Sequence, residues 1–230
     1  MNRDDFSREF GDLSSYYDQL DQLVHLVEAK SKEFNITAIR NYEDIWQKHI
    51  VDSLMILRSI EKLDVQFLNC AAEEHGRVNA PRVIDIGTGA GFPGLPLAIV
   101  CPQAHFVLVD STNKKIGVVN EFALALGLLN VECVWERAEE LSKDPHYKGQ
   151  FDLVTARQVA YLPKLLGVCV PFIKQNGQIA LYKEFNEEEL KDGNGTVAKI
   201  GFENNYSYKY KLIGVPNTRV ILFYRRFGGH

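Results

Sequence analysis

The chain has 230 residues and a formal net charge of −4. Its 46% hydrophobic and 24% charged residues are typical of a globular protein, which excludes a disordered or fibrous chain. The acidic balance excludes a uniformly basic nucleic-acid coat protein but is compatible with a local basic groove. The polar N-terminus has no apolar signal core, and no apolar run is long enough to span a membrane, so we expect a cytoplasmic protein.

The first third of the chain is predicted to be helical. From Leu13 onward, apolar residues recur at the spacing of one helix face, at Tyr16, Tyr17, Leu20, Leu23, Val24 and Val27. A second helical stretch is predicted from about Tyr42 to Leu63. We therefore expect an N-terminal helical extension over residues 1–65, followed by a polar connector over residues 66–81.

From Arg82 onward, short apolar strands alternate with helical stretches. The predicted strands are residues 82–86, 105–110, 131–135, 151–156 and 177–182, and the predicted helices are residues 93–100, 113–126 and about 161–170. This alternation predicts an α/β fold with a mostly parallel, seven-stranded sheet covered by helices on both faces. The last two strands, residues 207–212 and 218–226, follow each other without a helix, which predicts an antiparallel hairpin at a sheet edge. Residues 82–230 are thus expected to form one Rossmann-like domain.

The cysteines predict no metal site. Cys70, Cys101, Cys133 and Cys169 are spread singly along the chain, without a C-x-x-C pair or the spacing of zinc ligands. We expect reduced thiols and no bound metal.

A glycine-rich turn, VIDIGTGAGFPG at residues 83–94, is the most informative motif. Gly87 allows a tight turn, and Gly89 and Gly91 let a ligand approach the backbone without a Cβ in the way. Asp110 ends the following strand, where a doubly wound sheet places a carboxylate able to accept both ribose hydroxyls of a nucleoside. The motif therefore predicts a nucleoside-containing ligand.

Two ligand classes fit this turn. Gly89, Gly91 and Gly94 form a G-x-G-x-x-G pattern, which suits a dinucleotide such as NAD(P) with its pyrophosphate on a helix N-terminus. Asp85, which precedes the first glycine, would repel a diphosphate and instead suits a cationic ligand with an ammonium group. We favour S-adenosylmethionine, with a dinucleotide and a turn that serves only packing as the alternatives.

Three segments together resemble the RsmG/GidB family of bacterial methyltransferases, which methylate N7 of a guanine in 16S rRNA. They are NITAIRNYEDIWQKHIVDSL (residues 35–54), VIDIGTGAGFPGLPLAI (83–99) and FDLVTARQVAYL (151–162). The resemblance covers nearly the whole chain. It implies a class I methyltransferase fold behind a helical N-terminal extension and S-adenosylmethionine as cofactor. The implied partner is 16S rRNA within the small ribosomal subunit or an assembly intermediate, with the enzyme acting as a monomer.

The resemblance also implies roles for individual residues. It assigns the glycine loop to Gly87, Gly89 and Phe92, the ribose-binding acid to Asp110, the adenine side to Ala138 and Glu139, and the arginine after the fourth strand to Arg157. Asp85 and Gly91 complete the expected cofactor-binding set. The chain departs from the family at Lys183-Glu184, where the family often has Lys-Gly, so that an acid there either weakens an RNA contact or faces solvent.

Other methyl-transfer chemistries lack their motifs. The fourth strand ends in Thr155-Ala156-Arg157-Gln158, which is not the Asn/Asp-Pro-Pro-Tyr/Phe motif of amino-group methyltransferases. Carbon methylation of cytosine requires a thiolate in a Pro-Cys turn, whereas the chain has only the reversed Cys101-Pro102. Guanine N7 carries a free lone pair and no proton, so we expect alignment of the two reactants and no general base.

Several polar residues are candidates for substrate contacts. His49 and Asp52 share a predicted helix face, which indicates either a position at the mouth of the active site or a surface hydrogen-bonded pair. Lys114, Lys183 and Arg219 are candidate contacts to RNA phosphate, with Lys115 beside them, or alternatively ordinary solvated charges. A small-molecule methyltransferase, an NAD(P)-dependent oxidoreductase and a non-catalytic nucleoside-sensing or ribosome-binding module remain alternative functions.

Overall fold

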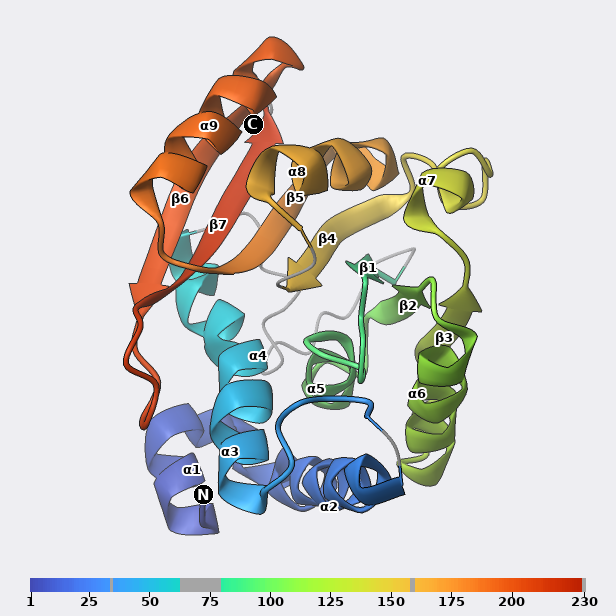
Figure 1. Ribbon diagram of the computed structural model, residues 1–230, viewed down its shortest axis with the longest axis vertical. Coiled ribbons are helices and arrows are strands. Elements are labelled where there is room, and N and C mark those ends of the chain that lie inside the picture. The colour runs from blue at the N-terminus through green and yellow to red at the C-terminus, as the bar shows by residue number, and fades with distance from the viewer. Residues whose placement is uncertain (34, 63–79, 158–159, 229–230) are drawn as a thin grey trace.

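The computed structural model describes residues 1–33, 35–62, 80–157 and 160–228, and Figure 1 shows their arrangement. One seven-stranded sheet has the order β3-β2-β1-β4-β5-β7-β6. Its strands are β1 (Arg82–Ile86), β2 (His105–Asp110), β3 (Val131–Trp135), β4 (Phe151–Arg157), β5 (Ile173–Glu184), β6 (Phe202–Tyr210) and β7 (Arg219–Arg226). The first five strands are parallel, and β7 pairs antiparallel with both β5 and β6, which confirms the predicted hairpin at the sheet edge.

Helices cover both faces of the sheet, as predicted from the alternating pattern. Their bounds are α5 (Gly94–Val100), α6 (Asn113–Ala125), α7 (Ala138–Leu141), α8 (Leu162–Cys169) and α9 (Glu187–Lys199), and a short 3-10 turn, Val170–Phe172, follows α8. Neighbouring strand residues alternate between two hydrophobic clusters: Val83 belongs to the cluster on the α5–α6 face and Ile84 to the cluster on the α8–α9 face. The inner strands are therefore buried on both sides, as expected for a parallel sheet between two helical layers, whereas the edge strands β3 and β6 are partly exposed.

Helix α9 is an element that the sequence analysis did not predict. Gly193 and Gly195 lie inside it, and glycine weakens a helix. The helix forms because Asn186 caps it by accepting a hydrogen bond from the Glu189 amide at 2.9 Å, and three glutamates occupy its first turn. Gly193 is required by packing, since a Cβ there would overlap Leu162 of α8.

The N-terminal third is helical, as predicted. It comprises α1 (Arg3–Phe10), a 3-10 turn (Gly11–Tyr16), α2 (Tyr17–Glu33), α3 (Tyr42–Ile45), a π-helical turn (Trp46–Val51), α4 (Asp52–Leu54) and a further 3-10 stretch (Met55–Lys62). The expected boundary at residue 65 and most of the expected connector, residues 66–81, lie outside the described residues. Within the described part of the chain, no helix is both long and apolar enough to cross a membrane.

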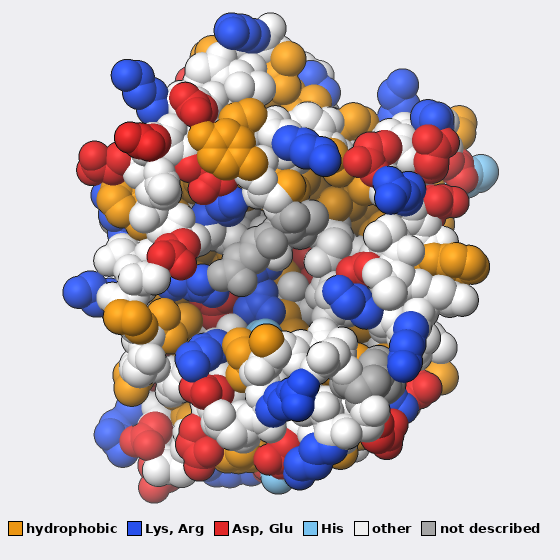
Figure 2. Space-filling view, viewed as in Figure 1, with side chains coloured by type: hydrophobic (Ala, Val, Ile, Leu, Met, Phe, Trp, Pro, Cys, Tyr) orange, Lys and Arg blue, Asp and Glu red, His pale blue; other side chains and the backbone are white. Residues whose placement is uncertain are grey.

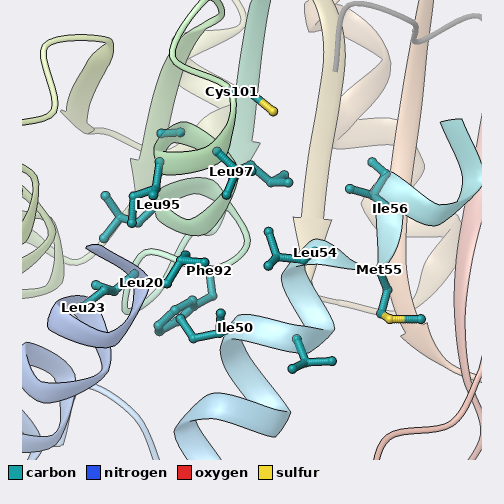
Figure 3. Packing of buried hydrophobic residues seen from close by; sticks show 14 of the residues in the cluster. Leu20, Leu23, Ile50, Leu54, Met55, Ile56, Phe92, Leu95, Leu97 and Cys101 are labelled. Carbon is teal, nitrogen blue, oxygen red and sulfur yellow. The ribbon is translucent and has the colours of Figure 1, made fainter. Parts of the chain in front are cut away.

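The N-terminal helices share one hydrophobic cluster with the sheet domain. Leu20 and Leu23 from α2, together with Ile50 and Leu54 from the second helical stretch, are fully buried in the cluster that contains α5, and Figures 1 and 3 show these helices beside it. Burying each such side chain contributes about 1.5–3 kcal/mol. This packing fixes the N-terminal segment against the same sheet that carries the glycine-rich turn.

Candidate functional site

A cavity of about 560 Å³ opens at the carboxyl ends of β1, β2, β3 and β4. The strand order reverses between β1 and β4, which is the topological switch point where doubly wound sheets bind their ligands. Residues of the N-terminal segment complete the wall. Figure 2 shows a hollow in the middle of this face with Lys and Arg side chains around it.

The glycine-rich turn forms one wall of the cavity. Gly87 and Gly89 line it and have φ values of 67° and 62°, a region that disfavours any residue with a Cβ. Gly91, with φ 94°, is not on the wall, and a Cβ there would overlap Leu95 of α5. Gly91 therefore serves the folding of the turn, whereas Gly87 and Gly89 expose bare backbone to a ligand.

Asp110 lies at the end of β2 on the cavity wall, where the sequence predicted it. Its Oδ2 accepts a hydrogen bond from the Gly89 amide at 3.1 Å, and its Oδ1 accepts one from the Thr112 amide at 2.9 Å. These two bonds fix the carboxylate, and each oxygen retains acceptor capacity for one further donor. The arrangement can accept two adjacent hydroxyl groups, as a ribose presents.

Asp85 does not line the cavity, which differs from the expectation that it meets an ammonium group there. Its carboxylate is fully buried and accepts hydrogen bonds from the Gly94 amide at 3.1 Å and from the Thr155 hydroxyl at 2.9 Å. Burial raises the pKa of Asp85 to about 6, and these hydrogen bonds oppose the rise. The Asp85 side chain lies on the side of β1 away from the cavity. Its two hydrogen bonds link the glycine-rich turn to β4.

The ends of β2 and β3 form the opposite wall. Ala138 and Glu139, at the start of α7, line the cavity where the resemblance implied an adenine side. The indole of Trp135 donates a hydrogen bond to the Ser111 carbonyl at 3.1 Å, which holds the two strand ends together. Arg137 lines the same wall, and the sequence analysis did not single it out.

His49 lines the cavity from inside the π-helical turn. It is 6% exposed, and its ring stacks on Phe92 with the centroids 4.3 Å apart and the planes at 10°. The Arg157 guanidinium donates a hydrogen bond to Nδ1 at 2.8 Å, so Nε2 carries the proton and donates to the Thr37 hydroxyl at 2.9 Å. Burial, together with the Arg157 charge, holds the pKa of His49 well below its usual range, and the imidazole is neutral.

Asp52 and His49 do not form a surface pair, because both are buried and each contacts Arg157. Asp52 is fully buried, and its Oδ2 accepts from Arg157 and from Arg219, each at 3.1 Å. The Tyr210 hydroxyl donates to Oδ1 at 2.6 Å. One carboxylate from α4 therefore joins β4, β6 and β7.

Two of the expected phosphate contacts are engaged in ion pairs away from the cavity wall. Arg219 is 11% exposed and pairs with Asp52. Lys183 is 12% exposed, pairs with Glu189 at 2.6 Å, and donates to the Ala160 carbonyl at 2.8 Å. Their positions on strands of the sheet interior favour paired charges, since an unpaired buried cation is costly.

The cationic residues on the wall differ from those expected. Lys115 lines the cavity, whereas its neighbour Lys114 does not. Lys164, in the first turn of α8, also lines it and was missed, although its position just after the fourth strand places it at the carboxyl edge of the sheet. Across the described ranges, no group of three or more His, Cys, Asp or Glu side chains could hold a metal ion.

Comparisons with known proteins agree with this geometry. A model of the GidB family, described as rRNA small subunit methyltransferase G, matches residues 16–212. Ribosomal RNA small subunit methyltransferase G of Moorella thermoacetica is 32% identical over 197 residues, covering 85% of this chain and 76% of the relative. The protein of the same name from Deinococcus deserti is 37% identical over 197 residues, covering 85% of this chain and 75% of the relative.

Solved structures share the fold at low sequence identity. The structure of M. jannaschii TYW2 in complex with AdoMet has a TM-score of 0.53 at 17% identity and covers 73% of this chain and 80% of that chain. Ribosomal protein L11 methylase from Lactobacillus delbrueckii has a TM-score of 0.51 at 18% identity, covering 70% of this chain and 75% of that chain. The fold is thus that of class I methyltransferases, and the match over residues 16–212 shows that the chain belongs to the GidB family, rRNA small subunit methyltransferase G.

Proposed function

We propose that the protein transfers a methyl group from S-adenosylmethionine to N7 of a guanine in 16S rRNA. The substrate is the rRNA within the small ribosomal subunit or an assembly intermediate, and the enzyme acts as a cytoplasmic monomer. One observation carries the proposal: a single cavity at the switch point is lined both by Asp110, whose carboxylate retains acceptor capacity for ribose hydroxyls, and by Arg157, which belongs to a buried cluster of charged residues. The names of the family relatives support the substrate class.

The residues on the wall fit S-adenosylmethionine. Asp110 accepts the ribose hydroxyls, the bare backbone of Gly87 and Gly89 admits the methionine portion, and Ala138 and Glu139 flank the adenine. A structural neighbour with the same fold, M. jannaschii TYW2, is in complex with AdoMet, which supports this choice. The Asp85 carboxylate takes up the Gly94 amide at the start of α5, where a dinucleotide would place its pyrophosphate, and this disfavours NAD(P).

The reaction makes modest demands on the protein. S-adenosylmethionine supplies a methyl group on a sulfonium, and the lone pair of guanine N7 can accept it without loss of a proton. Both ring nitrogens of His49 are engaged, with Arg157 and Thr37, so its imidazole is not placed as a base. The contribution of the chain is to hold both reactants in line and to exclude water from the cavity.

Cations at the rim of the cavity fit a polyanionic substrate. Lys115 of α6, Arg137 before α7 and Lys164 of α8 line the cavity. Figure 2 shows Lys and Arg side chains around the hollow. Because the whole chain has a net charge of −4, attraction of RNA depends on this local field and not on the total charge.

Binding and transfer test the proposal separately. Calorimetry should show binding of S-adenosylmethionine and no binding of NADH. Labelled methyl groups should enter 16S rRNA when the protein is mixed with small subunits or with deproteinised rRNA, and mass mapping of the digested rRNA should place the group on a guanine. Binding of the donor without transfer to either RNA substrate would contradict the rRNA assignment and favour a small-molecule acceptor. Light scattering should give the mass of one chain.

A further inference from the structure

Trp135 is an exposed aromatic residue beside the cavity. It is the last residue of β3 and is 59% exposed, whereas Trp46, the other tryptophan of the chain, is fully buried. The register of the parallel strands pairs Trp135 with Asp110 of β2, which lines the cavity. The indole therefore lies next to the candidate site, with much of its surface in contact with solvent.

The indole is held in one orientation. Its Nε1 donates a hydrogen bond to the carbonyl of Ser111, and Ser111 lines the cavity, as does Glu136, the next residue after Trp135. The N–H is the only polar group of a tryptophan side chain, so the exposed remainder is an apolar ring. A ring that is already ordered loses little conformational entropy when a planar ligand stacks on it. Trp135 can thus act as a stacking surface for such a ligand.

Cations lie on both loops that flank Trp135. Lys115 is in the first turn of α6, and Arg137 follows Trp135 by two residues; both line the cavity. The two carboxylates of this wall have other roles, because Glu136 accepts a hydrogen bond from the Arg137 amide and Glu139 is at the proposed adenine side. An aromatic ring with cations beside it is the combination that binds unpaired nucleic acid, by stacking on bases and by meeting phosphates.

The chemistry of the acceptor requires an unpaired guanine. In an A-form RNA helix, guanine N7 faces a deep and narrow groove that side chains cannot enter. A cavity can take up the base only after it has left the helix, and its neighbours in the strand then lose a stacking partner. Proteins that recognise unpaired RNA stack such bases on aromatic side chains. An exposed ring beside the cavity has the position and the chemistry for this contact.

We infer that Trp135 stacks on an unpaired base of the rRNA that neighbours the methylated guanine. The inference rests on the proposed function, because it concerns RNA bound at the same cavity. It adds to that function a contact surface for a nucleotide that does not react, with Lys115 and Arg137 on either side of it to meet its phosphates.

Kinetics of a Trp135 variant test the contact. The substrate is small subunits or deproteinised rRNA, whichever the wild-type protein methylates. Trp135→Ala should raise KM for this substrate by at least about fivefold, the scale of stacking one base on an aromatic side chain. The kcat and the Kd of S-adenosylmethionine should stay within about twofold, and Trp135→Phe, which keeps a ring, should recover most of the loss.

Salt dependence distinguishes stacking from a phosphate contact. Trp135→Ala should weaken RNA binding by the same factor at every salt concentration, because a stacked base releases no counterions. Phe227→Ala is the matched control, since Phe227 is also an aromatic residue and is 53% exposed. It follows β7, which runs antiparallel to β5, and so lies at the edge of the sheet opposite the cavity. This variant should leave KM unchanged.

Tryptophan fluorescence tests the contact in the wild-type protein, without any requirement that a variant folds. Because Trp46 is fully buried, quenching of the emission by a bound base reports Trp135. A single-stranded rRNA fragment that contains the methylated guanine should quench the emission of the wild type. The same fragment should leave the emission of Trp135→Phe unchanged.

The outcomes separate the inference from the proposed function. Unchanged KM in Trp135→Ala, or emission that bound RNA does not quench, would overturn the stacking contact. An equal rise of KM in Phe227→Ala would also overturn it, and so would a weaker Kd of S-adenosylmethionine with KM for RNA unchanged, which would assign the indole to the donor. Failure of the wild-type protein to methylate any RNA would instead overturn the proposed function.

Discussion

Two regions of the molecule, the glycine-rich turn with Asp110 and the polar cluster around Asp52, are built in different ways. The glycine-rich turn is one short stretch, residues 83–94, and Asp110 of the strand that follows it accepts a hydrogen bond from a backbone amide of the turn. The polar cluster gathers His49, Asp52, Arg157 and Arg219, whose contacts span more than 100 residues of sequence. A local motif thus builds the first region, whereas only the tertiary arrangement brings together the residues of the second.

The first prediction removes a charge from the polar cluster around Asp52. Arg219→Met leaves Asp52 with one cation fewer in a buried site, and we expect the free energy of unfolding to fall by about 3–5 kcal/mol. Arg225→Met on the same strand is the matched control, because the Arg225 side chain is 41% exposed and pairs with the half-buried Glu203, so it should cost at most about 1 kcal/mol. Urea unfolding measures both, and equal losses would show that Asp52 does not depend on Arg219.

The second prediction concerns Asp110, which the glycine-rich turn holds in place. Asp110→Ala removes the acceptor for the ribose, and we expect binding of S-adenosylmethionine to weaken by about 1.5–3 kcal/mol, the scale of hydrogen bonds to a charged group. Calorimetry with the 2′-deoxyribose analogue completes the comparison. The analogue should lose less affinity on the variant than on the wild type, and equal losses would mean that Asp110 does not touch the ribose.

The third prediction tests how tightly the turn is packed. A Cβ at Gly94 would overlap Leu108, so Gly94→Ala should lower the free energy of unfolding by about 1–3 kcal/mol. Gly117 in α6 has open space around it, and Gly117→Ala should raise the free energy of unfolding by about 0.5–1 kcal/mol because alanine favours a helix. Thermal unfolding of both variants checks the signs, and a loss in Gly117→Ala would contradict the packing argument.

The fourth prediction follows from the lowered pKa of His49. The folded protein keeps this imidazole neutral, whereas the unfolded chain protonates it as pH falls below about 6.5, so His49 contributes stability that is lost on acidification. The slope is at most about 1.4 kcal/mol per pH unit. Asp85, with its pKa raised to about 6, acts in the opposite sense, because its contribution is present at low pH and is lost as pH rises through about 6.

Stability profiles between pH 5 and pH 7 test this assignment. His49→Gln should lose less stability on acidification than the wild type. The variant lacks the contribution of His49 and keeps that of Asp85, which has the opposite sign. His146→Gln, at a side chain that is 88% exposed, should follow the wild-type profile. Parallel profiles for His49→Gln and the wild type would show that His49 is not held neutral.

The smallest expected effect concerns single cations at the rim. Lys164→Gln and Arg137→Gln should each make the slope of log affinity for rRNA against log salt shallower by about 0.7–0.9, if each residue contacts one phosphate. Lys174→Gln serves as the control. Lys174 pairs with Asp152 at the amino ends of β4 and β5, whereas the cavity lies at the carboxyl ends, so this variant should leave the slope unchanged. If only Lys183→Ala made the slope shallower, the phosphate contact would belong to Lys183 of β5, in spite of its ion pair with Glu189.

The sequence by itself determined the strands, their order of appearance, and the glycine-rich turn followed by a strand that ends in Asp110. Apolar runs that end at glycines or at Asp110 carry their own periodicity, and the resemblance over residues 35–54, 83–99 and 151–162 correctly indicated the family. The sequence analysis did not predict helix α9, because its two glycines disfavour a helix. The Asn186 cap and the packing of Gly193 against α8 stabilise it. Periodicity reports local preference and contains no information about such contacts.

Only the tertiary structure decided which polar residues act together. In the sequence, Asp85 looked like a ligand contact, and Arg219 and Lys183 looked like surface cations. The alternation of side chains along β1 places Asp85 on the buried side of the glycine-rich turn, where it accepts from the Gly94 amide. The packing of α4 against the sheet brings Asp52 to Arg219. The physical reason is that a buried charge requires a partner, and the partner is chosen by the strand register and helix packing that bring distant residues within about 3 Å of each other.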